Sequence, residues 1–258
     1  VKQLPENLFY GCGNLTTVTF AERATGDEND FSAVGKGSFR NCVKLTNVTL
    51  PDTTTQIGTE AFYGCSYLKS FRFPAGLKEI GDSAFADCEI LTGIDIPGGL
   101  ESLGSSAFMN CKGLTSISIP YAISIVSPNA FYGCVGLKNV TFSQSLIPSG
   151  TTSFVYGSMV RTIGGGAFAG CSGLETVSLS DGISAINGSA FAGCEKLNNL
   201  TLPADLKRIG SDAFDNCASI TYLLIPYGVT TIGDRAFRNC TKLEMPSLPA
   251  SVVAVGEY

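Results

Sequence analysis

Ten cysteines are the residues of this 258-residue chain with the most chemistry to offer, because thiolates bind zinc, attack electrophiles and form disulfides. Successive cysteines are separated by 30, 23, 23, 23, 23, 37, 23, 23 and 23 residues. The period is therefore 23 residues, with insertions of 7 and 14 residues. Zinc needs ligands that converge, and thiols repeated at this period form a line rather than a tetrahedron. The sequence thus predicts no metal site.

Other catalytic arrangements are also missing. The chain contains no histidine, which excludes Ser–His and Cys–His pairs. Its carboxylates are scattered, and no pair of them recurs at one position of the repeat. The glycine-rich stretch "IGGGAFAG" (163–170) does not lead from a strand into a long helix, so it is no phosphate-binding loop. We therefore expect a protein that is not an enzyme and that has no cofactor.

The cysteines mark a repeated unit with a structural purpose. A phenylalanine precedes every cysteine by three residues, and a leucine follows by three in nine of ten cases, with Ile220 in the tenth. The unit reads L-x-x-I-G-x-x-A-F-x-x-C-x-x-L-x-x-V-x-I-P-x-x. Alternating apolar residues in "LTSISIP" (114–120) predict a short strand that proline ends. The A-F-x-x-C segment predicts a single helical or 3₁₀ turn, and the preceding glycine predicts a positive φ angle.

Such units must stack, because one 23-residue unit cannot bury its apolar side alone. We expect one right-handed solenoid over residues 1–258, in the α/β repeat class, with about ten turns. A parallel sheet of L-x-x-V-x-I-P strands lies on its concave side, and short helical or 3₁₀ turns lie opposite. Insertions interrupt the repeats near 21–30 and 143–159. Pro246, at an inward strand position, predicts a weakened ladder near the C-terminus.

The stacking of the turns also indicates whether the cysteines form disulfides. Adjacent turns bring equivalent cysteines within disulfide range, but their side chains point in parallel and not at one another. Pairing would also divide identical turns into two classes. We expect ten free, buried thiols that pack as small hydrophobic side chains.

The charge and the hydropathy of the chain argue against two classes of partner, nucleic acids and membranes. The net charge is −5 and Lys and Arg form no run, so the cationic face that nucleic acid requires is absent. No apolar run approaches the roughly 18 residues of a membrane helix. The sequence predicts neither nucleic-acid binding nor membrane insertion within this chain.

The consensus resembles the BspA-like, or Treponema-type, leucine-rich repeats, which carry L-x-x-I-x-x-x-A-F-x-x-C-x-x-L-x-x-V-x-I-P. The resemblance covers essentially the whole chain. It implies a curved leucine-rich-repeat solenoid of the kind found in surface or secreted proteins of host-associated bacteria and some parasitic protists. It also implies an extracellular or cell-surface location and a role in adhesion or protein binding, with host or neighbouring-cell proteins or glycans as partners. The alternative is a structural spacer that has no ligand of its own.

Candidate ligand-binding residues lie at two places. The outward strand positions are mostly short and polar, with Arg72 and Asp95 on neighbouring strands and Tyr222 further along. We expect Arg72 and Asp95 to pair, for little energy if they are exposed.

Both insertions fall after a strand and before the next L-x-x-I, so they should emerge from the same edge. The first is acidic, but its spacing matches no calcium loop, and a solvated loop is favoured. The second holds Phe154 and Tyr156, with Tyr121 expected near its base. These aromatics either anchor a partner or fold back and plug the solenoid's flank.

Overall fold

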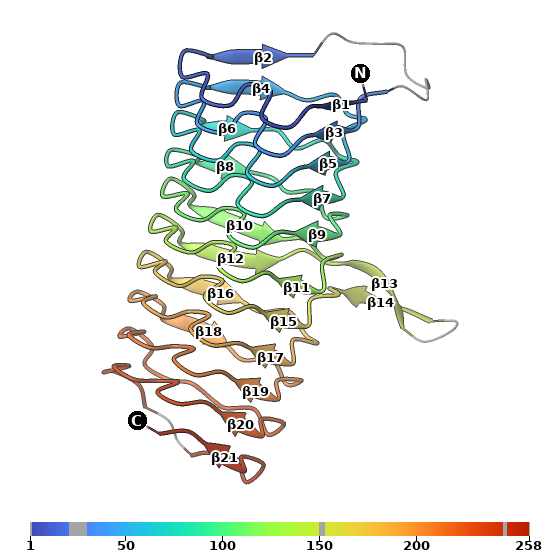
Figure 1. Ribbon diagram of the computed structural model, residues 1–258. Coiled ribbons are helices and arrows are strands. Elements are labelled where there is room, and N and C mark those ends of the chain that lie inside the picture. The colour runs from blue at the N-terminus through green and yellow to red at the C-terminus, as the bar shows by residue number, and fades with distance from the viewer. Residues whose placement is uncertain (1, 21–29, 150–152, 245–246, 258) are drawn as a thin grey trace.

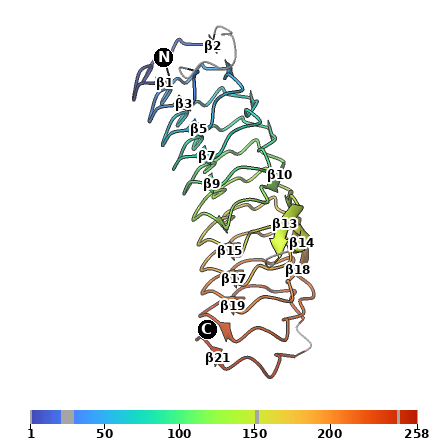
Figure 2. The same cartoon turned by 90° about the vertical axis from the view of Figure 1, so that its right-hand side faces the viewer.

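The computed structural model describes residues 2–20, 30–149, 153–244 and 247–257, which form a parallel-strand solenoid of about nine turns of about 23 residues (Figure 1). The axis of the stack bends gently along its length (Figure 2). Two features predicted from the sequence, the insertion at 21–30 up to residue 29 and Pro246, lie outside the described residues. None of the described residues belongs to a helix, and so none forms a helix that could cross a membrane.

One stack of strands is built from the L-x-x-V-x-I-P segments, as the sequence predicts. All its pairs are parallel, as in Ile117 opposite Val140 and Val177 opposite Leu200. Each strand alternates an exposed polar residue with a buried apolar one, which points the second toward the core. The members are β2 (Thr17–Thr19), β4 (Asn47–Thr49), β6 (Ser70–Phe71), β8 (Gly93–Ile94), β10 (Ser116–Ile119), β12 (Asn139–Phe142), β16 (Thr176–Ser178) and β18 (Asn199–Thr201).

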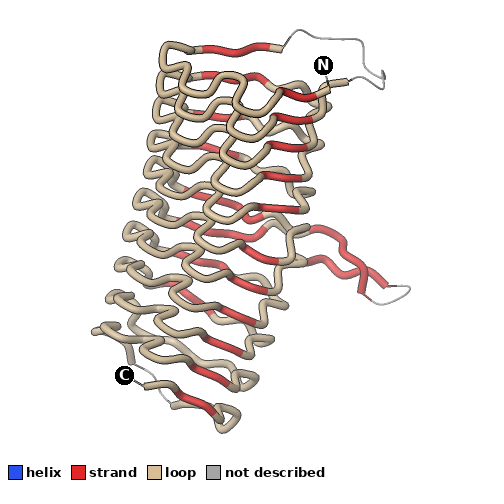
Figure 3. Tube along the Cα trace, viewed as in Figure 1, coloured by secondary structure: helices blue, strands red, loops and turns tan. Residues whose placement is uncertain are grey.

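A second parallel stack, which the sequence analysis did not predict, lies at the other side of each turn (Figure 3). Its strands are only two residues long and end at an isoleucine, leucine or valine, which glycine follows in most turns. It is divided into a five-stranded and a six-stranded sheet. The members are β1 (Gln3–Leu4), β3 (Ala33–Val34), β5 (Gln56–Ile57), β7 (Glu79–Ile80), β9 (Ser102–Leu103), β11 (Ile125–Val126), β15 (Thr162–Ile163), β17 (Ala185–Ile186), β19 (Arg208–Ile209), β20 (Thr231–Ile232) and β21 (Ala254–Val255).

The A-F-x-x-C segments join the two stacks as consecutive turns, which we call the turn legs, and the helical turns expected there are wrong. In one leg the amide of Cys88 donates to the carbonyl of Phe85, and the amide of Leu91 donates to that of Cys88. Residues in the left-handed region lie directly before the segment, at Ser83 (φ 52°), and within it, at Asp87 (φ 59°). A left-handed residue every few positions prevents a helix from propagating.

The glycine of I-G is needed for close packing between turns and not for a positive φ angle, so that expectation is also wrong. A Cβ on Gly81 would lie 2.5 Å from the amide nitrogen of Thr59 and 2.7 Å from the carbonyl carbon of Gly58. Both distances are shorter than real Cβ contacts. The amide of Gly81 meanwhile donates to the carbonyl of Ile57 in the preceding turn. This glycine therefore sets how tightly one turn rests on the next.

A column of phenylalanines runs through the core. The ten rings from Phe9 to Phe237 form consecutive stacked pairs, with centroids 5.0–5.5 Å apart and planes within 14° of parallel. Buried Ala, Cys, Leu and Ile side chains of the turns between the two ends surround this column in one continuous core. Offset stacks of this kind stabilise by about 0.5–1.5 kcal/mol per pair beyond the burial of their area.

Candidate functional site

The cysteines form a second column beside the phenylalanines. All ten thiols are free; eight are buried, Cys240 is partly buried and Cys12 is exposed. The thiol of Cys111 donates to the carbonyl of Phe85 in the preceding turn at 3.2 Å, and the same bond recurs for every cysteine from Cys42 to Cys240. The prediction of unpaired thiols is confirmed. The predicted burial is wrong for Cys12, which lies in the first described turn and is exposed.

Burial makes these thiols poor nucleophiles and poor metal ligands. It is the main cause that raises the pKa of Cys42 and Cys240 to about 11 and that of Cys171 to about 12. The pKa values of the other buried thiols are raised in the same direction by the same cause. A thiol must lose its proton before it attacks or binds zinc. Among the described residues, moreover, no group of Cys, Asp and Glu side chains could hold a metal ion.

The strand face is exposed and mostly polar, and the predicted pairing on it is wrong. Arg72 forms its ion pair with Asp52, at 3.0 Å between Nη1 and Oδ1, and not with Asp95. Both partners are more than two-thirds exposed. Solvent screening leaves such a pair with little energy. Asp95 is exposed on the neighbouring strand and takes part in no ion pair recorded for the described residues.

Large apolar side chains stand out of the strand face at one place, which we call the strand-face patch. It consists of Tyr222, Leu224 and Tyr227, which are 59%, 61% and 78% exposed. At the positions of β2 to β18 that are equivalent to Tyr222 and Leu224, the side chains are short, polar or charged. Sequence reasoning selected Tyr222 and missed Tyr227. The signal for Tyr227 was its place directly after Pro226, the position that Tyr121 takes after Pro120.

The second insertion is an antiparallel hairpin of β13 (Ser145–Ser149) and β14 (Ser153–Gly157), which leaves the edge of the solenoid between β12 and β15 (Figures 1 and 2). Its register sets Phe154 opposite Pro148 and Tyr156 opposite Leu146. The side chains of 145–157 lie outside the described residues, so their role stays a prediction.

Tyr121 lies at the base of this hairpin, as expected. The amide of Met159 donates to the carbonyl of Tyr121 at 2.8 Å, which anchors the segment that follows β14. The ring of Tyr121 is half-buried and covers Gly98, where a Cβ would meet its Cε1 at 2.9 Å. Tyr222 lies four turns further along, so the structure does not bring the predicted site residues into one cluster.

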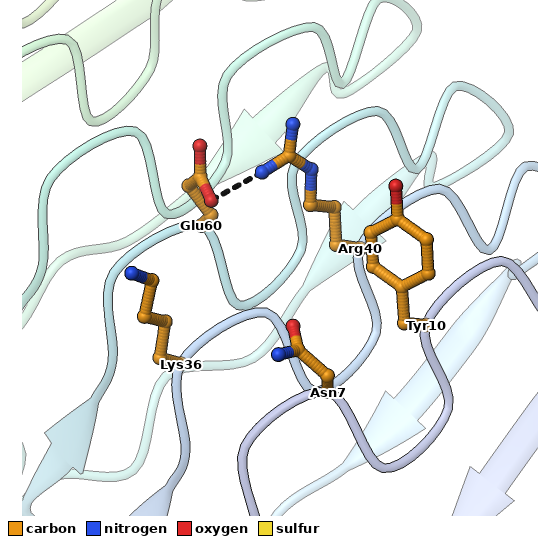
Figure 4. Close-up of a pocket in the computed structure, with 5 residues that line it drawn as sticks. All are labelled: Asn7, Tyr10, Lys36, Arg40 and Glu60. Atoms are coloured by element: carbon orange, nitrogen blue, oxygen red, sulfur yellow. Dashed lines mark hydrogen bonds and ion pairs between the residues drawn. The ribbon is translucent and has the colours of Figure 1, made fainter.

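A shallow groove on the turn legs was not predicted at all. Its volume is about 660 Å³, and it spans the first three turns. We call it the turn-leg groove. Figure 4 shows the five side chains that line it, which are Asn7, Tyr10, Lys36, Arg40 and Glu60. A sequence signal existed, because Tyr10, Arg40 and Tyr63 each follow the column phenylalanine directly. This position faces outward and places the three side chains on adjacent turns.

Comparisons with known proteins agree with this architecture. The chain matches the family profile described as "BspA type Leucine rich repeat region", in six copies, over residues 32–160 and 148–258. A leucine-rich-repeat protein of T. pallidum, of known structure, has 27% identity and a TM-score of 0.56, over 67% of this chain and 72% of that one. One from Bacteroides ovatus has 27% identity and a TM-score of 0.50, over 99% of this chain and 78% of that one.

A third leucine-rich-repeat protein, from Eubacterium ventriosum, has a TM-score of 0.58 over 96% of this chain and 82% of that one. At 20% identity it supports the fold alone. No curated protein matches the chain. The ten repeats, the stacked parallel strands and the family match over most of the sequence lead to one assignment: this chain belongs to the BspA-type leucine-rich-repeat family.

Proposed function

We propose that this chain is a non-enzymatic protein-binding module that acts in adhesion, either secreted or at the cell surface. The observation that carries the proposal is the strand-face patch of Tyr222, Leu224 and Tyr227. Contiguous exposed apolar side chains mark interaction sites. Aromatic residues supply much of the binding energy at interfaces between proteins, because they bury a large area with few rotatable bonds.

The partner that fits this patch is a protein of the host or of a neighbouring cell, with glycans as a second class. The polar positions around the patch would form the rim of such an interface. Arg72 and Asp95 are charged positions of the same face and would steer the partner's orientation. Tyr121, Phe154 and Tyr156 would add a second contact at the hairpin, on the edge of the solenoid.

A structural spacer is the second candidate, and the uninterrupted phenylalanine column favours it. A rod with nine stacked ring pairs holds its two ends at a fixed separation without any ligand. A spacer, however, has no use for tyrosines that are 59% and 78% exposed. The two candidate functions therefore predict different results when the strand-face patch is mutated: only a binding module should lose affinity for a partner.

A double variant at the patch separates the candidates. Tyr222→Ser with Leu224→Ser removes the apolar surface, and Thr176→Ala with Ser178→Ala is the matched control on an earlier strand of the same face. The full-length chain and both variants are tested by surface plasmon resonance on immobilised extracellular-matrix proteins and mucins. We expect the patch variant to bind at least about tenfold more weakly, since interface anchors contribute about 2 kcal/mol or more.

Two results would contradict the proposal. One is equal binding by the patch variant and the control. The other is no binding by the unchanged chain to any immobilised surface, which supports the spacer. Circular dichroism of both variants checks that the loss of binding is not a loss of fold.

A further inference from the structure

The turn-leg groove combines an exposed aromatic ring with polar groups of both charges. Tyr10, 53% exposed, stands at one wall of the groove. Asn7 and Lys36 line it from two successive turns, and Glu60 lines it from the third (Figure 4). This site lies on the turn legs and is separate from the strand-face patch, so it does not depend on the function proposed above.

Arg40 is fixed in place by its neighbours. Its guanidinium carbon lies 4.9 Å from the centroid of the Tyr63 ring and 5.8 Å from that of Tyr10. Its Nη1 donates to the carboxylate of Glu60. A cation held between rings and a carboxylate loses little further freedom when a ligand arrives. The groove is therefore largely preformed on this side.

Tyr63 is fixed in turn. Its hydroxyl is hydrogen-bonded to Asp87, which raises the pKa of Tyr63 and keeps it a neutral donor. Asp87 also accepts a hydrogen bond from the side-chain amide of Asn110 at 2.9 Å. A chain of polar contacts thus supports the wall of the groove from two further turns.

Of the two cationic side chains in the groove, one is free to pair with a ligand. Lys36 and Arg40 against Glu60 give the groove a net charge of +1. Arg40 is already paired with Glu60, whereas Lys36 is exposed and no carboxylate of the described residues lies within ion-pair distance of it. An anionic group placed in the groove would meet the ammonium of Lys36. The carboxylate of Glu60, on the next turn, offers acceptor capacity for hydroxyl donors.

We propose that the turn-leg groove binds an acidic sugar, a pyranose that carries a carboxylate. The sugar ring packs on Tyr10, its carboxylate pairs with Lys36, and its hydroxyls donate to Glu60 and exchange hydrogen bonds with Asn7. An acidic peptide meets only half of these requirements, because its carboxylates would suit Lys36 but it has no hydroxyl donors for Glu60. A polyol with one carboxylate supplies donors and negative charge together.

The test uses the full chain and three probes. They are a tetrasaccharide of alternating glucuronate and N-acetylglucosamine, a neutral tetrasaccharide of N-acetylglucosamine, and a hexaglutamate peptide. Binding is measured by calorimetric titration at low and at high salt. We expect the acidic tetrasaccharide to bind most tightly, and more weakly as salt rises, because an exposed ion pair is screened.

Variants assign the binding to the groove. Lys36→Gln should weaken binding of the acidic tetrasaccharide by about two- to fivefold, because the ion pair of an exposed lysine is partly screened by solvent. Tyr10→Ala should weaken the acidic and the neutral sugar alike. The controls are Tyr132→Ala, at the same position of a later leg, and Lys112→Gln; both should bind as the unchanged chain does.

Three outcomes would overturn the proposal. The first is no binding of the acidic tetrasaccharide. The second is tighter binding of hexaglutamate, which would make the groove a site for acidic proteins. The third is an equal loss in the control variants. Binding of the sugar by the Tyr222→Ser, Leu224→Ser double variant should be unchanged, so failure at one site is distinguishable from failure at the other.

Discussion

A rise in pH above about 8.5 should destabilise this protein steeply, because its thiol column is neutral in the fold and titrates when the chain unfolds. Burial raises the pKa of Cys42 to about 11 and of Cys171 to about 12, and it shifts the pKa of the other buried thiols in the same direction. An unfolded thiol has a pKa of about 8.5. The folded pKa lies above the unfolded one, so this contribution to stability is complete below pH 8.5. It is lost as the pH rises toward the folded pKa.

The size of the effect follows from the number of thiols. Each thiol that stays protonated in the fold lowers the unfolding free energy by about 0.4 kcal/mol at pH 8.5 and about 1.4 kcal/mol at pH 9.5, relative to neutral pH. Eight buried cysteines together lower it by about 3 and about 11 kcal/mol. The whole unfolding free energy of a folded domain is about 5–15 kcal/mol. We therefore expect unfolding between these two pH values.

Urea unfolding followed by circular dichroism, at pH 7.0, 8.0, 8.5 and 9.0 in the presence of a reductant, measures the slope. Cys111→Ala should reduce the slope of unfolding free energy against pH by about one-ninth, since it removes one of the nine thiols whose pKa is raised in the fold. Cys12→Ala is the matched control, because the Cys12 thiol is exposed. An unfolding free energy that varies by less than about 1 kcal/mol from pH 7 to 9 would refute this reasoning.

Two further predictions concern the thiols and the hairpin. Alkylation of the native protein should label Cys12 first and the eight buried cysteines slowly, whereas unfolded and unreduced protein should take up ten labels by intact mass. Five or fewer labels would show that disulfides are present. Deletion of residues 144–157, which joins Ser143 to Ser158 and restores the 23-residue spacing, should leave the unfolding free energy within about 1 kcal/mol, because loop length affects stability weakly. A loss above about 3 kcal/mol would instead show that Phe154 and Tyr156 plug the flank.

The deletion is expected to succeed because the hairpin re-enters the solenoid in register. The amide of Met159 donates to the carbonyl of Tyr121, as the amide of Ala122 donates to the carbonyl of Gly98 one turn earlier. Met159 and Ala122 therefore occupy the same place in their turns, although 14 extra residues separate the two turns along the chain.

The repeat predicted the stack of L-x-x-V-x-I-P strands and the free thiols, because both follow from the spacing of apolar residues. The conformation of the turn legs was missed, since a run such as Ala84, Phe85 and Cys88 is also compatible with a helical turn. A signal was nevertheless present: the second residue after each column phenylalanine is always Gly, Asn or Asp, the residues that best tolerate a positive φ. The second stack was missed because two-residue strands are too short to alternate.

The sites were harder to predict, because each is made by departures from the repeat and not by the repeat itself. Tyr222 was found as an aromatic in a polar column. The turn-leg groove was not, because Tyr10 and Arg40 are 30 residues apart and Arg40 and Tyr63 are 23 apart, so the first insertion hides their common position. No single turn contains the groove.

The close contact between Gly81 and the preceding turn means that the solenoid can lengthen only by whole turns. Because the spacing of the backbones leaves no room for a Cβ, each added turn contributes one fixed increment, about 4.8 Å in a parallel sheet. A gene that gains 23 codons extends the rod by one increment and leaves every earlier contact in place. A gain of any other size must be expelled from the stack, as the hairpin β13–β14 is. Insertion or deletion of repeats can therefore change the length of such a solenoid, and the distance between two exposed side chains on it, only by whole multiples of one turn.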